Sequence, residues 1–228
     1  MEYPDCNPIE WQRVRDNGEI SVLLIRHGQT EWNKQRRFLG RTDIPLDATG
    51  RQQAALLAHS LAHIPFSAIY SSPLSRAWGT AEAMATPRAM EPIVAEGLTE
   101  LDQGHLEGRF GSNLKADFPD FYRQWTEDPT HARIPGGETL AECSRRSIEA
   151  FMSIVREQTP DKPCAIVSHK VAISAIICQA LDLAIRDNMT IEQRNTTINL
   201  LGIKDGKITV YGLNNARHLT ETLPIERP

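Results

Sequence analysis

The stretch Val22-Leu23-Leu24-Ile25-Arg26-His27-Gly28 decides the fold of this chain. Its apolar half, residues 22–25, predicts a short buried strand, and that strand stops abruptly at Arg26. In α/β proteins ligands bind beyond the carboxyl ends of the strands, so Arg26 and His27 are expected where a substrate would lie. Gly28 lets the backbone turn sharply there and approach a ligand closely. An imidazole beside a permanent cation suits an anionic ligand such as a phosphate.

Further short apolar runs along the chain alternate with amphipathic segments. Strands are expected at residues 68–71, 92–95 and 164–168, and a closing hairpin at 196–203 and 207–213. Helices are expected after residue 49, from Pro73 to about residue 85, after Thr139, and over 171–183. This order predicts an α/β fold, specifically a three-layer α/β/α sandwich whose mostly parallel sheet has helices on both faces.

Local signals predict where three of these helices begin. Thr49 with Gln52, and Thr139 with Glu142, have the spacing of a capping box. Ser72 precedes Pro73, which suits an N-cap residue followed by proline in the first turn. Glu138 is also expected to start a helix.

Length and composition are those of an ordinary globular protein. The chain has 228 residues, of which 40% are hydrophobic and 24% charged, and a net charge of -4. We predict an N-terminal extension over residues 1–20, loosely ordered and pinned by Trp11, and a single domain over 21–228 that carries an insertion at about 101–135. The insertion holds an aromatic cluster, for which packing of a helical cap is favoured over a lid.

The same features bear on partners and location. The acidic balance argues against a nucleic-acid surface. The first twenty residues lack an apolar core, and the longest apolar stretch, 171–178, is too short to span a membrane, so a cytoplasmic protein without a membrane partner is expected. Cys143, Cys164 and Cys178 are expected to be buried free thiols. His59 and His63 have a zinc-compatible spacing but lack a third ligand, so no metal site is predicted.

Several longer motifs resemble those of the histidine phosphatase superfamily, which includes the cofactor-dependent phosphoglycerate mutases. The resemblance extends from about Ser21 to Leu213, in the order which that family uses. It rests on Arg26-His27-Gly28-Gln29-Thr30-Glu31-Trp32-Asn33, Gly40-Arg41-Thr42-Asp43, Tyr70-Ser71-Ser72-Pro73-Leu74-Ser75-Arg76-Ala77, Thr99-Glu100-Leu101, Leu106-Glu107-Gly108, Pro135-Gly136-Gly137-Glu138-Thr139 and Val167-Ser168-His169. It implies a phosphoglycerate mutase-like fold.

The resemblance also implies roles for five residues. His27 would be the nucleophile that forms a phosphohistidine, and Glu100 the acid that protonates the leaving group. Arg26, Arg76 and His169 would bind the non-bridging phosphoryl oxygens. Such chemistry calls for no cofactor and no metal, because the cationic groups stabilise the transferred charge.

Three further residues are predicted to bind substrate. Asn33 and Thr42 match positions that line the family's phosphate pocket or its entrance. Lys170 follows the second histidine, where the family usually has small residues. We predict that its charge favours a substrate with a second anionic group.

These roles predict a phosphomonoesterase acting on small phosphorylated metabolites. A phosphoglycerate mutase is the nearest alternative, but residues 101–135 form a short insertion for a sealing lid. A phospho-ligand binding module without turnover and a metal-dependent phosphatase are further alternatives. The sequence is compatible with a homodimer.

Overall fold

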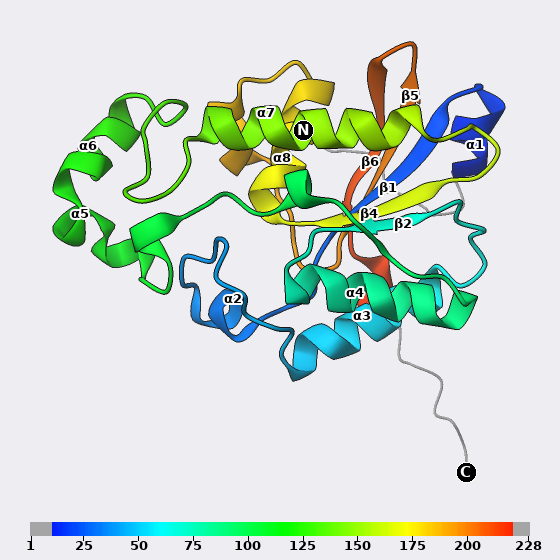
Figure 1. Cartoon of the computed structure of the whole chain (residues 1–228), viewed down its shortest axis with the longest axis horizontal. Helices are drawn as coiled ribbons and strands as arrows, with labels where there is room; N and C mark the ends of the chain where they lie inside the picture. Colours follow the sequence, from blue (N-terminus) through cyan, green and yellow to red (C-terminus); the bar gives the residue numbers. More distant parts are fainter. Residues whose placement is uncertain (1–10, 221–228) are drawn as a thin grey trace.

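A computed structural model describes residues 11–220, which form a six-stranded sheet between two layers of helices (Figure 1). The strand order is β3-β2-β4-β1-β5-β6, with β3, β2, β4 and β1 parallel and β5 and β6 antiparallel. Helices α3 and α4 cover one face, and α7 and α8 cover the other (Figure 1). The predicted three-layer α/β/α fold is confirmed, with a mixed sheet in which the parallel strands predominate.

The bounds of the strands lie close to the predicted ones. They are β1 (Ile20–Arg26), β2 (Ile69–Ser71), β3 (Ile93–Val94), β4 (Cys164–Ser168), β5 (Ile198–Lys204) and β6 (Lys207–Asn215). The α-helices are α1 (Trp11–Asp16), α2 (Glu31–Gln35), α3 (Ala48–Ser60), α4 (Ser75–Ala85), α5 (Leu114–Asp117), α6 (Pro119–Glu127), α7 (Leu140–Arg156) and α8 (Lys170–Ala180). Short 3-10 turns connect them, the longest being Ile185–Thr190.

The central strand β1 is apolar throughout because both of its faces are covered. Leu23 and Ile25 pack into the core that includes residues of α3 and α4. Val22 and Leu24 point the other way, into the core formed with α7 and α8. Since successive side chains of a strand point to opposite faces, a continuous apolar run is what a doubly covered strand requires.

The register of the parallel strands brings three carboxyl ends level with one another. Arg26 pairs with Ser168, and Ser71 pairs with Val167. Beyond the strands, the His27 N–H donates to the Ser168 carbonyl at 3.0 Å, and the Ser72 N–H donates to the Val167 carbonyl at 3.0 Å. Residues His27, Ser72 and His169 therefore follow three neighbouring strands at the same edge of the sheet.

The prediction of a loosely ordered N-terminal extension is wrong for residues 11–20. Residues 11–16 form helix α1, and β1 begins at Ile20. Trp11 is 6% exposed and Val14 is fully buried in the core beneath the sheet. Two apolar side chains three residues apart lie on one helical face, so this short helix buries both. Residues 1–10 lie outside the described part of the chain.

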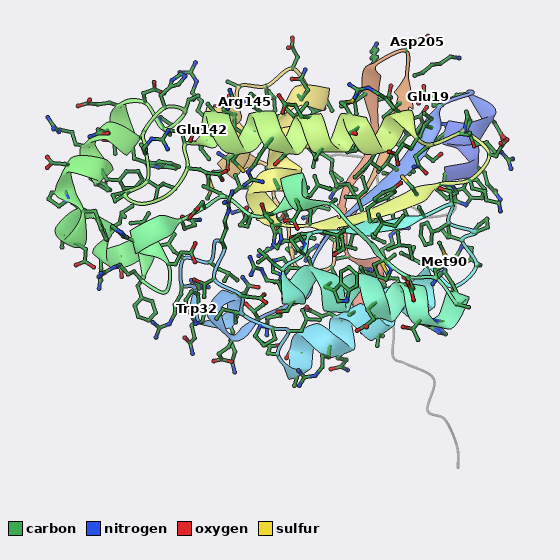
Figure 2. The ribbon with its side chains drawn as sticks, in the orientation of Figure 1. Glu19, Trp32, Met90, Glu142, Arg145 and Asp205 are labelled. Atoms are coloured by element: carbon green, nitrogen blue, oxygen red, sulfur yellow. The ribbon has the colours of Figure 1, made fainter. Side chains whose placement is uncertain are left out.

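The helix starts are partly as predicted. At α7 the Thr139 hydroxyl accepts from the Glu142 N–H, and the Glu142 carboxylate accepts from the Thr139 N–H, so that capping box is confirmed. Glu142 lies in the first turn of α7 (Figure 2). Glu138 does not start this helix, because its carboxylate is ion-paired with Arg41 and Arg146.

Two predicted caps are wrong. Helix α3 is capped by Asp47, whose carboxylate accepts from the Gly50 N–H at 2.7 Å, instead of by Thr49. Asp47 precedes the helix, so its side chain can reach the free N–H groups that Thr49, already inside the first turn, cannot cap. Helix α4 begins at Ser75 after Leu74, and Ser72 has a different partner, described below.

The segment 101–135 contains helices α5 and α6, which project from one end of the sheet (Figure 1). Their aromatic residues pack in a third apolar cluster: Phe121 is buried, and Phe118 and Trp125 are partly buried against it. Elsewhere, Cys143, Cys164 and Cys178 are buried free thiols, as predicted.

No helix within residues 11–220 has the length and hydropathy that crossing a bilayer requires.

Candidate active site

His27 follows β1 directly and is 2% exposed. Its Nδ1 lies 2.7 Å from the Gly28 carbonyl oxygen. Because a carbonyl oxygen only accepts, Nδ1 carries the proton, and the lone pair is on Nε2. Burial lowers the pKa of His27 well below its usual value, and the charges of Arg76 and Arg26 lower it further. The imidazole is therefore neutral at pH 7, with Nε2 available as a nucleophile.

His169 follows β4 and is fully buried. Its ring centroid lies 5.0 Å from that of His27, with the two rings tilted by 57°. The Arg76 Nε–H donates to His169 Nδ1 at 3.3 Å, so the proton of the neutral ring is on Nε2, which lies 2.8 Å from the Ser72 hydroxyl. Burial, followed by the charge of Arg76, lowers the pKa of His169 well below its usual value.

Arg76, in the first turn of α4, is a fully buried cation. Besides His169, it binds two carbonyl oxygens of the loop after α2, that of Thr42 at 3.0 Å through NH1 and that of Gly40 at 2.6 Å through NH2. These contacts use three of the five N–H groups of a guanidinium, and two are left for a ligand. The structure thus places Arg76 beside His169 and gives it the additional task of holding this loop.

The guanidinium of Arg26, the last residue of β1, makes one hydrogen bond within residues 11–220, from NH1 to the Gln193 carbonyl at 2.7 Å. Its Nε is buried and has no hydrogen-bond partner among residues 11–220. An unpaired buried donor is unfavourable, so a ligand that accepts from it would be stabilised. This unpaired donor lies on the residue next to His27 in the chain.

Glu100 is 6% exposed and lies in the turn that follows residues 96–98. Its Oε1 accepts from the Leu101 N–H at 2.8 Å and the Val171 N–H at 3.1 Å, whereas Oε2 has only a 3.4 Å contact with the latter. Burial raises the pKa of Glu100, against the opposing effect of these N–H groups and of Arg76 and Arg26. With Oε1 held by two donors, Oε2 is the oxygen able to carry and transfer a proton.

The position of Glu100 depends on Arg146 of α7, which the sequence analysis missed. Its guanidinium donates to three carbonyl groups of the loop, those of Gly97, Thr99 and Glu100, at 2.7–3.0 Å. It also binds both oxygens of the Glu138 carboxylate, at 2.7 and 2.8 Å. Nothing in the local sequence around Arg146 distinguishes it from the other charges of this helix.

Asn33 and Thr42, both predicted to bind substrate, have structural partners. The Asn33 Oδ1 accepts from the Thr30 N–H at 3.2 Å and from Asn195 at 3.3 Å, which completes a capping box at α2. Asn195 also donates to the His27 carbonyl at 3.0 Å, so Asn33 reaches the nucleophile through it. The Thr42 hydroxyl donates to Glu107.

Lys170, the first residue of α8, is half-buried and lines a cavity of about 660 Å³ together with Arg26, Arg36 and Arg194. Its Nζ lies 3.9 Å from the Met189 sulfur, and no carboxylate of residues 11–220 lies within 4 Å of it. Burial, and then the charge of Arg26, lower the pKa of Lys170. The cavity is therefore cationic and bounded by Arg26.

Ser72 is a second residue whose place the sequence analysis missed. We expected it to cap a helix, but its hydroxyl lies 2.8 Å from His169 Nε2 and accepts a long hydrogen bond, 3.4 Å, from the N–H of Leu74 ahead of α4. A detectable signal was present, because Ser72 follows a short strand as Arg26-His27 and His169 do. Gln193 and Asn195, in the loop before β5, gave no such signal.

The comparisons agree with this geometry. Residues 22–216 match the family model of the histidine phosphatase superfamily (branch 1). Phosphoserine phosphatase 1 of Hydrogenobacter thermophilus is 30% identical over 202 residues, which are 89% of this chain and 95% of the relative. A Salmonella choleraesuis protein named "Probable phosphoglycerate mutase GpmB" is 32% identical over 193 residues, 85% of this chain and 89% of the relative.

Solved structures with the same fold include one bacterial protein and one protozoan protein. YhfR of Bacillus stearothermophilus has a TM-score of 0.80 at 27% identity, with 88% of this chain and 99% of that one covered. Phosphoserine phosphatase of Entamoeba histolytica, in complex with 3-phosphoglyceric acid, has a TM-score of 0.79 at 28% identity with the same coverage. The chain belongs to the histidine phosphatase superfamily, as its motifs and its fold together require.

Proposed function

We propose that this protein is a phosphomonoesterase that hydrolyses small phosphorylated metabolites through a phosphohistidine on His27. One observation carries the proposal. The two imidazoles lie 5.0 Å apart at one edge of the sheet, and the Gly28 carbonyl holds the His27 proton on Nδ1. That arrangement leaves His27 Nε2 as a nucleophile among cationic and N–H donors, as transfer of an anionic phosphoryl group requires.

The reaction proceeds in two displacements. Nε2 of His27 attacks phosphorus, the ester P–O bond breaks, and the departing alkoxide takes the proton of Glu100. Water then attacks the phosphohistidine, the N–P bond breaks, and the Glu100 carboxylate accepts a proton of that water. Arg26, Arg76 and His169 stabilise the charge on the phosphoryl oxygens, with the unpaired Nε–H of Arg26 as the clearest free donor.

Hydrolysis is favoured over mutase activity by two observations. Several relatives are named as phosphatases, including those from Hydrogenobacter thermophilus and Entamoeba histolytica. The insertion at 101–135 is also short for a lid that would keep water from the phosphoenzyme. The relative from Salmonella choleraesuis, whose name is that of a mutase, makes isomerisation of phosphoglycerate the assay to run in parallel.

A binding module without turnover would not need a buried acid of raised pKa near Arg26 and Arg76. The presence of Glu100, whose Oε2 has only a long 3.4 Å contact, therefore supports catalysis. A metal-dependent mechanism makes a separate prediction, namely loss of activity on treatment with a chelator and recovery with added metal.

The test is release of inorganic phosphate from p-nitrophenyl phosphate and from a set of phosphorylated metabolites. We expect His27→Ala to lose activity by about 10⁴-fold or more, because it removes the nucleophile. Rapid quench with ³²P-labelled substrate into alkaline SDS should trap label on the wild type, in a form that is stable in base and lost on later treatment with acid. Equal rates in wild type and His27→Ala would overturn the proposal, as would isomerisation of phosphoglycerate that outpaces phosphate release.

Lys170 is proposed to favour a substrate with a second anionic group. Its charge lies with those of Arg36 and Arg26 in a cavity that, within residues 11–220, is lined by one carboxylate, that of Glu192, which is 3.6 Å from Arg194. We expect Lys170→Gly to lower kcat/KM for 3-phosphoglycerate by about tenfold relative to a simple alkyl phosphate. An unchanged ratio of the two would refute this role. A cytoplasmic location and a homodimer stay predictions.

A further inference from the structure

A second, apolar cavity of about 200 Å³ lies under the helices of the insertion. Ten of its twelve lining residues are apolar, and they include Phe38, Leu114, Phe121 and Trp125. These four come from the loop after α2 and from α5 and α6, so the insertion and the body of the protein enclose it together. A cavity lined in this way by apolar and aromatic side chains suits an apolar group.

Two residues that line this cavity also hold the proposed proton donor, Glu100, through their backbone N–H groups. Leu101, which lines it, follows Glu100 in the chain and donates its N–H to that carboxylate. Val171, on the opposite element, also donates its N–H to the Glu100 carboxylate while it lines the cavity. In the proposed reaction Glu100 protonates the leaving oxygen, which places the alcohol part of the ester close to Glu100 and so close to these two lining residues.

The charges of the site lie on the other side. Met189 lines both cavities, and its sulfur contacts the Lys170 amine, so it separates the cationic cavity from the apolar one. Two polar side chains line the apolar cavity, those of Gln103 and Asn188. The Asn188 amide is already bound to the Ile185 carbonyl. The apolar cavity thus has no charge to neutralise and little to offer a polar ligand.

From this arrangement we infer that the substrate is a phosphomonoester whose alcohol carries an apolar group about the size of one aromatic ring, and that this group occupies the cavity beside Glu100. The size follows from the volume, because an apolar cavity of about 150 Å³ is enough to hold benzene. The inference rests on the proposed function, since Glu100 as the acid determines on which side the alcohol lies.

The test compares two esters that differ only in this group, 3-phenylpropyl phosphate and n-propyl phosphate. Both release primary alkoxides of similar basicity, so a difference in kcat/KM reports binding of the ring. We expect wild type to prefer the phenyl ester by about tenfold or more. Leu114→Trp, which fills the cavity from a partly exposed wall, should remove most of that preference and leave n-propyl phosphate within about twofold.

Two further variants make the result specific. Leu114→Asp should cause the same selective loss of kcat/KM for the phenyl ester, because it places a charged side chain at the wall of the cavity. Leu183→Trp, the same change at a leucine that is 39% exposed and outside the cavity, should alter neither ester. Equal kcat/KM for the two esters in wild type would overturn the inference, and so would a loss in the Leu114 variants that is the same for both. Failure of the proposed function is distinguishable, because p-nitrophenyl phosphate would then not be hydrolysed either.

Discussion

At the scale of single residues, the proposed nucleophile, His27, and the proposed acid, Glu100, have their pKa values shifted in opposite directions. Burial lowers the pKa of His27 and raises that of Glu100. Burial therefore favours a neutral imidazole and a neutral carboxylic acid, since it disfavours the charged form of either group. These are the protonation states that attack on phosphorus and donation to the leaving group require.

The pH dependence of kcat/KM follows from these directions. Activity should fall at low pH as His27 gains a proton, but only below its usual pKa, because its pKa is lowered. Activity should fall at high pH as Glu100 loses its proton, and this limb lies above the usual value because that pKa is raised. Glu100→Gln should abolish the high-pH limb and lower kcat for alkyl esters by about 10²- to 10³-fold.

The control for this prediction is Asp102→Asn, which neutralises a nearby carboxylate that is 25% exposed. It should keep both limbs of the profile. With p-nitrophenyl phosphate, whose leaving group needs little protonation, Glu100→Gln should lose less activity. A high-pH limb that persists in Glu100→Gln and disappears in Asp102→Asn would assign the acid to Asp102 instead.

At the scale of elements, helix α7 supports the site from outside it. Arg146 binds three carbonyl groups around Glu100 and the carboxylate of Glu138. Burial on its own would raise the pKa of Glu138, but the hydrogen bonds from Arg146 and from the Asp102 N–H leave it lowered. The planar guanidinium thus connects the helix, the Glu100 loop and the Glu138 turn in one network.

Arg146→Met should therefore affect both stability and catalysis. We expect the free energy of unfolding to fall by about 3 kcal/mol, because the partly buried Glu138 loses its main partner. We expect kcat to fall more than KM rises, because Glu100 loses its support while the phosphate-binding groups stay. Urea unfolding and steady-state kinetics measure the two effects.

Arg133→Met provides the comparison, since Arg133 pairs with Glu142 of the same helix but is 59% exposed. It should leave both the free energy of unfolding and kcat nearly unchanged, because an exposed ion pair is screened by solvent. Arg146→Lys should restore only part of the activity, since an ammonium cannot span three carbonyl groups and a carboxylate. Full activity in Arg146→Met would show that the loop holds Glu100 without this network.

At the scale of the whole molecule, helix α1, which precedes the first strand, covers part of the sheet. Helix α1 packs beneath β1 and β5, and the Ser21 hydroxyl donates to the Trp11 carbonyl at 3.2 Å. Trp11 and Val14 share a core cluster with Leu23 and Leu200. The stability of the sheet that carries the site therefore depends on Trp11 and Val14, which lie about 15 positions before His27 in the chain.

Trp11→Ala should lower the free energy of unfolding by about 3 kcal/mol or more, through lost burial and the cavity left behind. The folded fraction should keep its kcat, because α1 does not touch the site. Ile93 is 47% exposed on the edge strand β3. Ile93→Ala should therefore change the free energy of unfolding by about 0.5 kcal/mol or less. Thermal unfolding of the two variants measures these changes. Equal losses of stability in both would contradict the packing described for α1.

The sequence by itself determined the features that depend on neighbours in the chain. The apolar run before Arg26 predicted a doubly covered strand, and the Thr139–Glu142 spacing predicted a capping box, since hydrogen bonds within one turn decide such a structure. His169 came from the family resemblance, and the shared edge of the parallel strands β1 and β4 explains why it meets Arg26 and His27. The assignment of Glu100 came from resemblance alone.

Only the tertiary structure decided the features that depend on residues far apart in the chain. Ser72 faces His169, 97 positions away, and Arg146 holds carbonyl groups 46 to 49 positions before it. Helix α1 forms because its two apolar side chains find a core built by later strands. No local pattern encodes such partners, because their energy comes from burial and hydrogen bonds that exist only after the sheet has assembled.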